Sequence, residues 1–190
     1  MKEIAMFMWI VIAVIAVLVI WFVATYNRLQ RLKVYISEAW SGIDVQLKRK
    51  ANILPNLVDV LKMQMKYEGD LLTNITAARS GIVNGSNADR MKADNALTKM
   101  MPNIYAVAEN YPQLASSSSF TKLMSEIKDC EDKITYSRNR YNIAVAEFNM
   151  ALVTIPSNIV AGMMSLQKAE LFEISAQSRE DADNMRIKDI

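Results

Sequence analysis

The sequence predicts an all-α protein in which an N-terminal transmembrane helix precedes an antiparallel four-helix bundle of long helices and a short C-terminal helix. Residues 4–24 are continuously apolar, and the remainder carries apolar residues at helical spacing. Glycine and proline are scarce, at 5 and 4 of 190 residues, which favours long uninterrupted helices. We therefore expect an anchor over residues 1–25, a bundle over 26–156, a short helix over 157–174 and a polar tail over 175–190.

The opening segment is long enough to cross a bilayer. Ile4 to Ala24 is a run of 21 apolar residues, and at about 1.5 Å per residue such a helix spans roughly 30 Å, the thickness of a hydrocarbon core. Trp9 lies near one end, and Trp21 and Tyr26 lie near the other, where aromatic side chains prefer the membrane interfaces. A cleaved signal peptide is the alternative, but its apolar core is shorter and ends in a small-x-small site. The run therefore favours an uncleaved anchor in contact with the lipid bilayer.

Basic residues follow the apolar run and predict its orientation. Arg28, Arg31 and Lys33 come just after it, whereas the single Lys2 before it is offset by Glu3. The positive-inside rule then places the bundle in the cytoplasm and the N-terminus outside, in a single-pass protein of the cell inner (cytoplasmic) membrane. These three residues can also pair with anionic lipids at the membrane interface, or they can act as topology signals alone.

The first two bundle helices are separated in this interpretation by a proline. No Gly or Pro occurs after the anchor until Gly42, so the anchor helix is expected to run straight on into the bundle. Pro55 should then stop or sharply kink the helix, because proline lacks an N–H and restricts the residue before it. A second helix is expected from Pro55 to Ile82, followed by a loop over Gly81 to Asn87.

The third and fourth helices follow from apolar stripes. The third is expected over residues 88–110, with Pro102 kinking or dividing it. The fourth carries apolar residues in alternating steps of three and four from Phe120 to Ile155, which is a heptad seam over five heptads. The serines of residues 116–119 offer N-cap oxygens, and Pro156 terminates the helix before a short apolar helix that extends to Ile174.

The composition argues against catalysis, metal binding and nucleic-acid binding. The chain has no histidine, a net charge of +2 and one cysteine, Cys130, on the heptad seam. It therefore lacks the commonest general base and metal ligand, and no broad basic surface attracts nucleic acid. Charged residues that could meet across the bundle are Glu68, Arg79, Glu131, Asp132 and Arg138. Helical di-metal sites use Glu-x-x-His motifs, and this chain has no histidine. We therefore expect no bound metal, no cofactor and no enzymatic activity.

Two groups of residues are candidate interaction surfaces. The first is the polar cluster of Asp44, Gln46 and Arg49, with Lys48 and Lys50 beside them. It could bind a partner or lipid headgroups, and the alternative, which we favour, is a solvated face with interhelical ion pairs. The second group is apolar and comprises Met163, Met164, Leu166 and Phe172, with Leu171. It either packs back on the bundle or contacts the bilayer or another subunit.

Several segments resemble the LemA family of bacterial membrane proteins. The matching segments include Glu38-Ala39-Trp40-Ser41-Gly42 and Leu54-Pro55-Asn56-Leu57-Val58. The stretch from Trp40 to Val58 is the most specific, and the resemblance covers about residues 26–173. Downstream matches are Glu68, Ala78-Arg79, Tyr111-Pro112, Glu131, Arg138, Tyr141-Asn142, Phe148-Asn149, Pro156, Asn158 and Phe172-Glu173. The resemblance implies a transmembrane helix followed by a cytoplasmic four-helix bundle without an established enzymatic activity. Two features depart from the family pattern: Met164-Ser165-Leu166 replaces a Phe-Gly-Phe element, and Pro102 is atypical.

These observations predict a non-enzymatic, membrane-anchored helical scaffold of the LemA type. The long stripes and the spanning helix favour self-association into a homo-oligomer, and other membrane proteins are further candidate partners. The alternative function is a membrane-tethered four-helix bundle that senses a ligand, although sensors usually pass their signal to an output domain.

Overall fold

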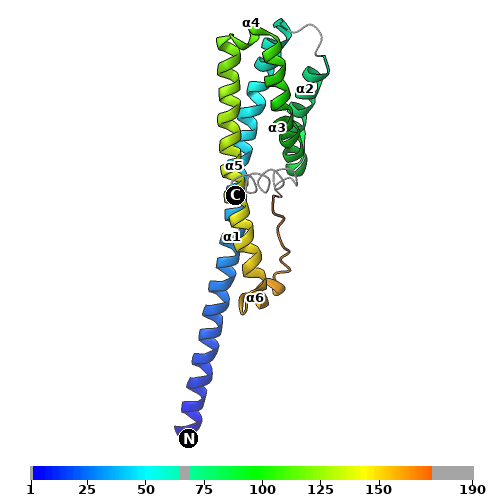
Figure 1. Cartoon of the computed structure of the whole chain (residues 1–190). Helices are drawn as coiled ribbons and strands as arrows, with labels where there is room; N and C mark the ends of the chain where they lie inside the picture. Colours follow the sequence, from blue (N-terminus) through cyan, green and yellow to red (C-terminus); the bar gives the residue numbers. More distant parts are fainter. Residues whose placement is uncertain (1, 65–68, 173–190) are drawn as a thin grey trace, which may run out of the picture. The chain divides into compact units, whose positions relative to one another are not determined.

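The computed structural model describes residues 2–64 and 69–172, which contain six helices and confirm the all-α class. The helices are α1 (Lys2–Gln64), α2 (Gly69–Asn84), α3 (Asn87–Asn110), α4 (Pro112–Ala115), α5 (Ser118–Val153) and α6 (Ser157–Met163) (Figure 1). The chain forms two compact units. One is Trp40–Arg138, and the other combines the segments before residue 40 and after residue 138, so α1 and α5 contribute to both.

The apolar run begins α1, and this helix continues without a break to Gln64. The expectation that the anchor extends into the following helix is thus confirmed. Residues 2–20 are exposed throughout, and an 18-residue window of this helix has a mean hydropathy of 3.0. Within the described residues no other single helix is long and apolar enough to cross a membrane, which suggests a single span.

The prediction that Pro55 ends the first helix is wrong, because α1 passes through it and ends nine residues later. A proline leaves the carbonyl four residues earlier without its helical N–H partner. Here that carbonyl belongs to Ala51, and the Nε–H of Arg79 on α2 donates to it at 3.2 Å. Leu54 and Leu57 are fully buried on either side of the proline, so packing also holds the helix together. The second helix accordingly begins at Gly69 instead of Pro55.

We predict that Arg79 stabilises α1 only because Pro55 is present. Arg79→Met should lower the free energy of unfolding by about 1 kcal/mol, the usual contribution of such a hydrogen bond. In a Pro55→Ala background the restored N–H can bond to Ala51, so the same substitution should have almost no effect. Urea unfolding of the four variants in detergent micelles measures this coupling, and equal losses in both backgrounds would contradict it.

The connection between α2 and α3 is shorter than the predicted loop. Residues 81–84 still belong to α2, and only Gly85 and Ser86 separate the two helices. Ser86 caps α3 in a reciprocal capping box with Asp89. The Ser86 hydroxyl donates to Oδ2 of Asp89 at 2.6 Å, and this hydrogen bond lowers the pKa of the Asp89 carboxyl. Gly81 lies at a close approach of the helices, since a Cβ atom there would stand 2.7 Å from the Cβ of Ala93. Glycine at this position therefore serves helix packing and not a turn.

The predicted third helix is confirmed as α3, and the fourth as α5. Pro102 lies inside α3 and does not divide it, so of the two predicted effects, a kink or a division, the division is wrong. The four-residue α4, which begins at Pro112, was not predicted. Ser117 supplies the expected cap at the start of α5, where its hydroxyl accepts from the N–H of Phe120 at 3.4 Å.

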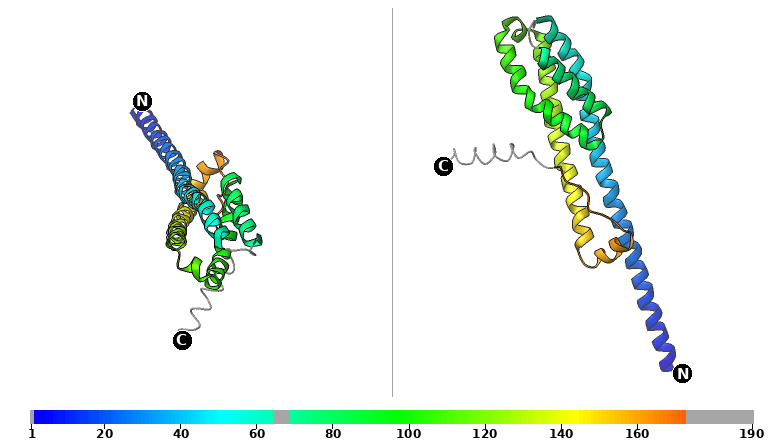
Figure 2. Two further views of the ribbon diagram at one scale, coloured as in Figure 1. Left: turned by 90° about the horizontal axis from the view of Figure 1, so that it is seen from above. Right: turned by 90° about the vertical axis from the view of Figure 1, so that its right-hand side faces the viewer.

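Within the unit Trp40–Arg138, the helical segments of α1, α2, α3 and α5 lie alongside one another (Figures 1 and 2). Side-chain bonds join α1 to each of the other three, as described for Arg79 and below. Each helix contributes buried apolar residues at intervals of three and four. Large side chains that are fully buried in these helices are Ile43, Leu47, Leu54, Leu57, Leu61, Ile75, Ile82, Leu97, Ile104, Ile127 and Cys130, and Leu114 of α4 is also fully buried.

The second unit packs α6 and the C-terminal half of α5 against α1. Its core consists of Leu29, Leu32, Phe148, Ala151, Val160 and Ala161. Half-buried side chains surround this core, including Trp21 and Phe22 of α1 and Met164 and Leu166 after α6. The segment that follows α6, residues 164–172, is not helical (Figure 1).

The expected C-terminal helix over 157–174 is therefore wrong beyond Met163. The N–H groups of Ser165 and Leu166 bond to the carbonyls of Gly162 and Ala161, which is the Schellman arrangement that ends a helix. Ser165 has a φ of 51°, in the left-handed region where glycine is preferred. The Phe-Gly-Phe element that the resemblance implies would place glycine at this position, so the departure noted in the sequence falls on a residue with a backbone requirement. Residues 173–190, including the predicted polar tail, lie outside the described residues.

We predict that Ser165→Gly stabilises the end of α6 by about 0.5–1 kcal/mol, since it removes the cost of a left-handed serine. Slower amide hydrogen exchange in residues 164–172 would report this gain. Ser116→Gly is the matched control, because Ser116 has a φ of −83° and gains nothing from glycine. Equal or faster exchange in the Ser165 variant would contradict the prediction.

Candidate functional site

The unit Trp40–Arg138 contains a buried ion pair between α1 and α3. The ammonium of Lys50 lies 2.7 Å from Oδ1 of Asp94, and their side chains are 0% and 3% exposed. Both residues lie on apolar stripes, with Leu47 and Ala51 near the lysine and Met91 and Leu97 near the aspartate. A charge removed from water to this extent needs a close counter-ion, which explains why the two residues occur together.

Two residues of α5 complete the group around this pair. Glu131 Oε1 accepts from Lys50 Nζ at 3.1 Å, and Arg138 donates to Oδ2 of Asp94 at 2.6 Å. Thr98 of α3 joins the group, because its hydroxyl lies 3.2 Å from the same oxygen of Glu131. Glu131 and Arg138 are about one quarter exposed, so this side of the network reaches the surface. We call these five residues the buried charge network.

The buried charge network is balanced, with two cations and two carboxylates in alternating contact. Burial lowers the pKa of Arg138, and the neighbouring Asp94 and Glu131 oppose that shift. The network joins α1, α3 and α5, so its geometry supports a structural role in fixing the register of three helices. Among the described residues, no group of three Asp, Glu, Cys or His side chains could hold a metal ion.

The charged residues that were expected to meet across the bundle do so only in part. Glu131 and Arg138 belong to the network, but Arg79 bonds to the backbone of α1 and Asp132 is exposed. Glu68 lies outside the described residues. The sequence interpretation missed Asp94 altogether and treated Lys50 as part of a solvated face. The sequence signal that could have identified this ion pair is that one charged residue, Lys50 in α1 and Asp94 in α3, interrupts an apolar stripe of each helix.

The polar cluster at the first candidate surface takes part in ion pairs. Asp44 pairs with Lys48 one turn away and with Arg90 of α3. Arg49 lies 2.7 Å from Asp129 of α5, and Lys133 and Arg49 lower the pKa of that carboxyl. The amide oxygen of Gln46 is buried without a hydrogen-bond partner. These contacts agree with the interpretation as a face with interhelical ion pairs, and an interaction role for the cluster stays a prediction.

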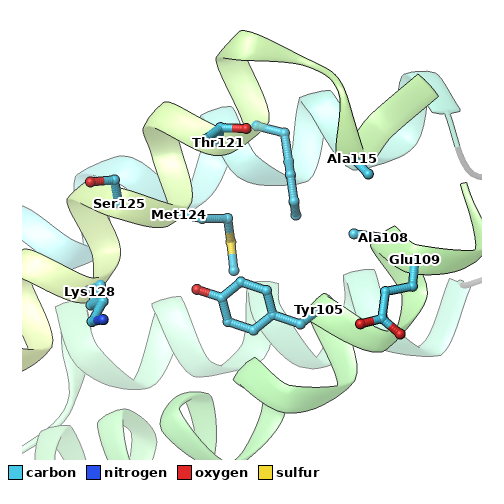
Figure 3. A pocket seen from close by; sticks show the side chains of 9 residues that line it. Tyr105, Ala108, Glu109, Ala115, Thr121, Met124, Ser125 and Lys128 are labelled. Carbon is cyan, nitrogen blue, oxygen red and sulfur yellow. The ribbon is translucent and has the colours of Figure 1, made fainter. Parts of the chain in front are cut away.

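A hollow of about 430 Å³ lies between α3, the α4 turn and α5. Tyr105, Phe120 and Met124 form much of its wall, and Figure 3 shows Tyr105 and Met124 directed toward one another. Glu109 and Lys128, of opposite charge, also line it. The hollow is open and mostly apolar, without a buried polar group to orient a ligand.

In the other unit, two asparagines of α5 hold the chain that follows α6. Asn149 accepts from the N–H of Ala169 and donates to its carbonyl, both at 2.9 Å. Asn142, two turns earlier, does the same with Phe172 at 2.8 and 3.1 Å. Tyr141 adds a bond to the Glu170 carbonyl and a ring contact with Phe172, with centroids 4.5 Å apart. These bonds satisfy the main chain of a segment that has no helix or strand partner.

The residues of the second candidate surface therefore differ in burial, since some pack against the protein and others are exposed. Met164 and Leu166 are half-buried and pack against the core of this unit, and Phe172 is half-buried against Tyr141. Met163 is 70% exposed. Leu171 is also exposed, at 50%, so Met163 and Leu171 are the members of this group that the protein leaves uncovered.

The predicted membrane-interface residues all lie on α1. Trp9 is 70% exposed, and Tyr26, Arg28, Arg31 and Lys33 are also exposed. Trp21 is half-buried because it packs against the core formed with α6. Near its end, the apolar run therefore packs through Trp21 against the protein's own core.

Comparison with known proteins identifies the family of this chain. The sequence profile of the LemA family matches residues 39–186, which is more than three quarters of the chain. The chain belongs to the LemA family. It is 28% identical to protein LemA of Metamycoplasma hominis over 88% of this chain and 77% of that protein. It is 23% identical to magnetosome protein MamQ 2 of Paramagnetospirillum magneticum, over 84% of this chain and 71% of that protein.

For this LemA family member we predict that Asp94 is the most sensitive position of the buried charge network. Asp94→Leu leaves Lys50 buried without its closest counter-ion and should cost about 3–5 kcal/mol of unfolding free energy. Lys50→Met should cost less, because Asp94 keeps its bond to Arg138. The double variant should lose less unfolding free energy than the two single variants lose together, because it removes both buried charges.

Denaturant unfolding of the full chain in micelles measures these differences. Asp129→Leu is the matched control, because it breaks an Arg–Asp pair between helices whose side chains are 44% and 42% exposed. Such an exposed pair contributes about 0–1 kcal/mol. A loss at Asp94 no larger than the loss at Asp129 would contradict a structural role for the network.

Proposed function

We propose that this protein is a non-enzymatic scaffold of the bacterial inner membrane that associates with copies of itself through α5. In this proposal α1 spans the bilayer, and the helical segments of α1, α2, α3 and α5 form an antiparallel four-helix bundle in the cytoplasm. The exposed apolar start of α1 supports the anchor, because an aqueous protein would not expose such a run. Other membrane proteins are further candidate partners.

The observation that carries self-association is a second apolar seam on α5. Ile143, Ala146, Met150 and Val153 follow one another in steps of three, four and three residues, which is coiled-coil spacing. All four are exposed, with Ile143, Met150 and Val153 at 52, 64 and 54%. The opposite face of the same helix, with Val145 and Phe148, is buried in the chain's own core. We call these four residues the outer seam.

Membrane anchoring favours one geometry for the pair. Copies held in one bilayer by identical N-terminal helices share one orientation, so a two-fold axis along the membrane normal sets their α5 helices parallel. The outer seam residues of the two copies then face their own equivalents, as the a and d residues of a parallel coiled coil do.

The test is disulfide crosslinking in native membranes. In a Cys130→Ala background, Ala146→Cys should form a dimer under mild oxidation, whereas Ser116→Cys, exposed before α5, should not. Adding Met150→Glu should abolish the Ala146 crosslink, because a charge on the seam is not tolerated there. Equal crosslinking at both positions, or no effect of Met150→Glu, would contradict the proposal.

The Ser116→Cys variant also tests orientation. The proposed topology requires that a membrane-impermeant maleimide label this cysteine only after the cells are made permeable. Labelling in intact cells would reverse the topology and would favour the second candidate function, ligand sensing outside the cytoplasm. The hollow beside Tyr105 is the observation that supports that second candidate.

A further inference from the structure

The turn between α5 and α6 and helix α6 itself carry three large apolar residues that are exposed. Ile155, Ile159 and Met163 are 78, 59 and 70% exposed. The residues between them include Val160 and Ala161, which are buried in the core of the unit. Helix α6 is therefore apolar on its outer face as well as on its inner face, and a surface helix in water normally has a polar outer face. We call Ile155, Ile159 and Met163 the apolar tip.

The chain around the apolar tip is free of charge over a long stretch. No Asp, Glu, Lys or Arg occurs between Glu147 and Lys168, an interval of 20 residues. Charged residues make up 22% of the whole sequence, so such an interval is distinctive in the part of the chain that follows the anchor. It removes the main obstacle to contact with lipid.

The apolar tip belongs to a core that also contacts α1, and this contact lies near the end of the apolar run. Trp21 and Phe22 pack against the core that α6 completes, and the apolar run ends two residues later at Ala24. The two further views in Figure 2 agree that α6 lies beside this part of α1. If residues 4–24 lie in the bilayer, the tip is at the level of its interface.

The direction of α6 also suits an interface. Helix α6 makes an angle of 93° with α5, and the end of α5 runs beside α1 within this unit. A helix perpendicular to a membrane-spanning helix lies in the membrane plane, which is how amphipathic helices contact a bilayer surface.

Two hydroxyl groups of this turn are hydrogen-bonded within the chain, which favours contact with lipid, whereas the side-chain oxygen of Asn158 is buried without a hydrogen-bond partner. The Thr154 hydroxyl donates to the Met150 carbonyl at 2.8 Å. The buried Ser157 hydroxyl lies 2.7 Å from the carbonyl of Ala151 and 2.9 Å from that of Thr154. The Schellman arrangement after Met163 covers the last carbonyls of α6.

We propose that the apolar tip is a second membrane contact, in which α6 lies flat in the bilayer interface beside the exit of α1. This inference rests on the proposed membrane anchoring by α1. With two contacts, α1 and the C-terminal half of α5 are both fixed to the membrane, and the unit cannot tilt freely about the single span. The occupant of the tip is the lipid bilayer, and a second copy of the chain is the competing occupant.

Spin labels on the full chain test this contact. In a Cys130→Ala background, single cysteines at Val17, Val34, Ile159 and Met163 carry a nitroxide, and the protein is reconstituted in vesicles of phosphatidylethanolamine and phosphatidylglycerol. Oxygen concentrates in the hydrocarbon region, whereas a nickel chelate stays in water. The ratio of their collision rates with each label therefore reports lipid contact. Val17 is the positive control inside the apolar run, and Val34, 53% exposed on α1, is the matched aqueous control.

We expect the oxygen-to-nickel ratio at Ile159 and Met163 to exceed the ratio at Val34 several-fold and to approach the ratio at Val17. A ratio at both tip positions equal to that at Val34, with a high ratio at Val17, would overturn the inference and leave the anchor intact. Low collision rates with both reagents would also overturn it, because they would mean that protein covers the tip. A low ratio at Val17 would instead contradict the proposed anchoring itself.

Discussion

A single uninterrupted helix, apolar on all sides in its first part and amphipathic in its second part, is the element on which the rest of this molecule depends. The first part of α1 exposes apolar side chains on all sides, and the part beyond Ala39 buries one stripe in a protein core. No loop separates these two parts of the helix. The partner helices α2, α3 and α5 each bond to this helix through a charged side chain.

The polar contacts to α1 explain how so long a helix is kept regular. Arg79 covers the carbonyl that Pro55 exposes, and Lys50 and Arg49 connect the helix to α3 and α5. The inner pair is the more consequential, because a buried charge tolerates few alternative positions. Apolar packing supplies most of the stability, whereas these pairs restrict the register in which the helices can pack.

The sequence predicted the larger features correctly, since they follow from composition and periodicity. The all-α class, the long first helix, α3 and α5 could be read from apolar spacing and from the scarcity of glycine and proline. The continuation of α1 through Pro55 could not be predicted, because it depends on a contact between distant residues, Arg79 with the carbonyl of Ala51. The course of the non-helical chain after α6 could not be predicted either, because it depends on the bonds of Asn149 to Ala169. Asp94 was missed for the same reason, since a charge on an apolar stripe has meaning only once its partner Lys50 is known.

The central claim is that residues 4–24 remain in the protein and lie in lipid. The intact mass of the chain recovered from alkali-washed membranes tests it most directly. If the apolar run is an anchor, the protein stays with the membranes and its mass includes residues 4–24. Recovery in the soluble fraction, as a chain shortened by the length of the apolar run, would contradict it.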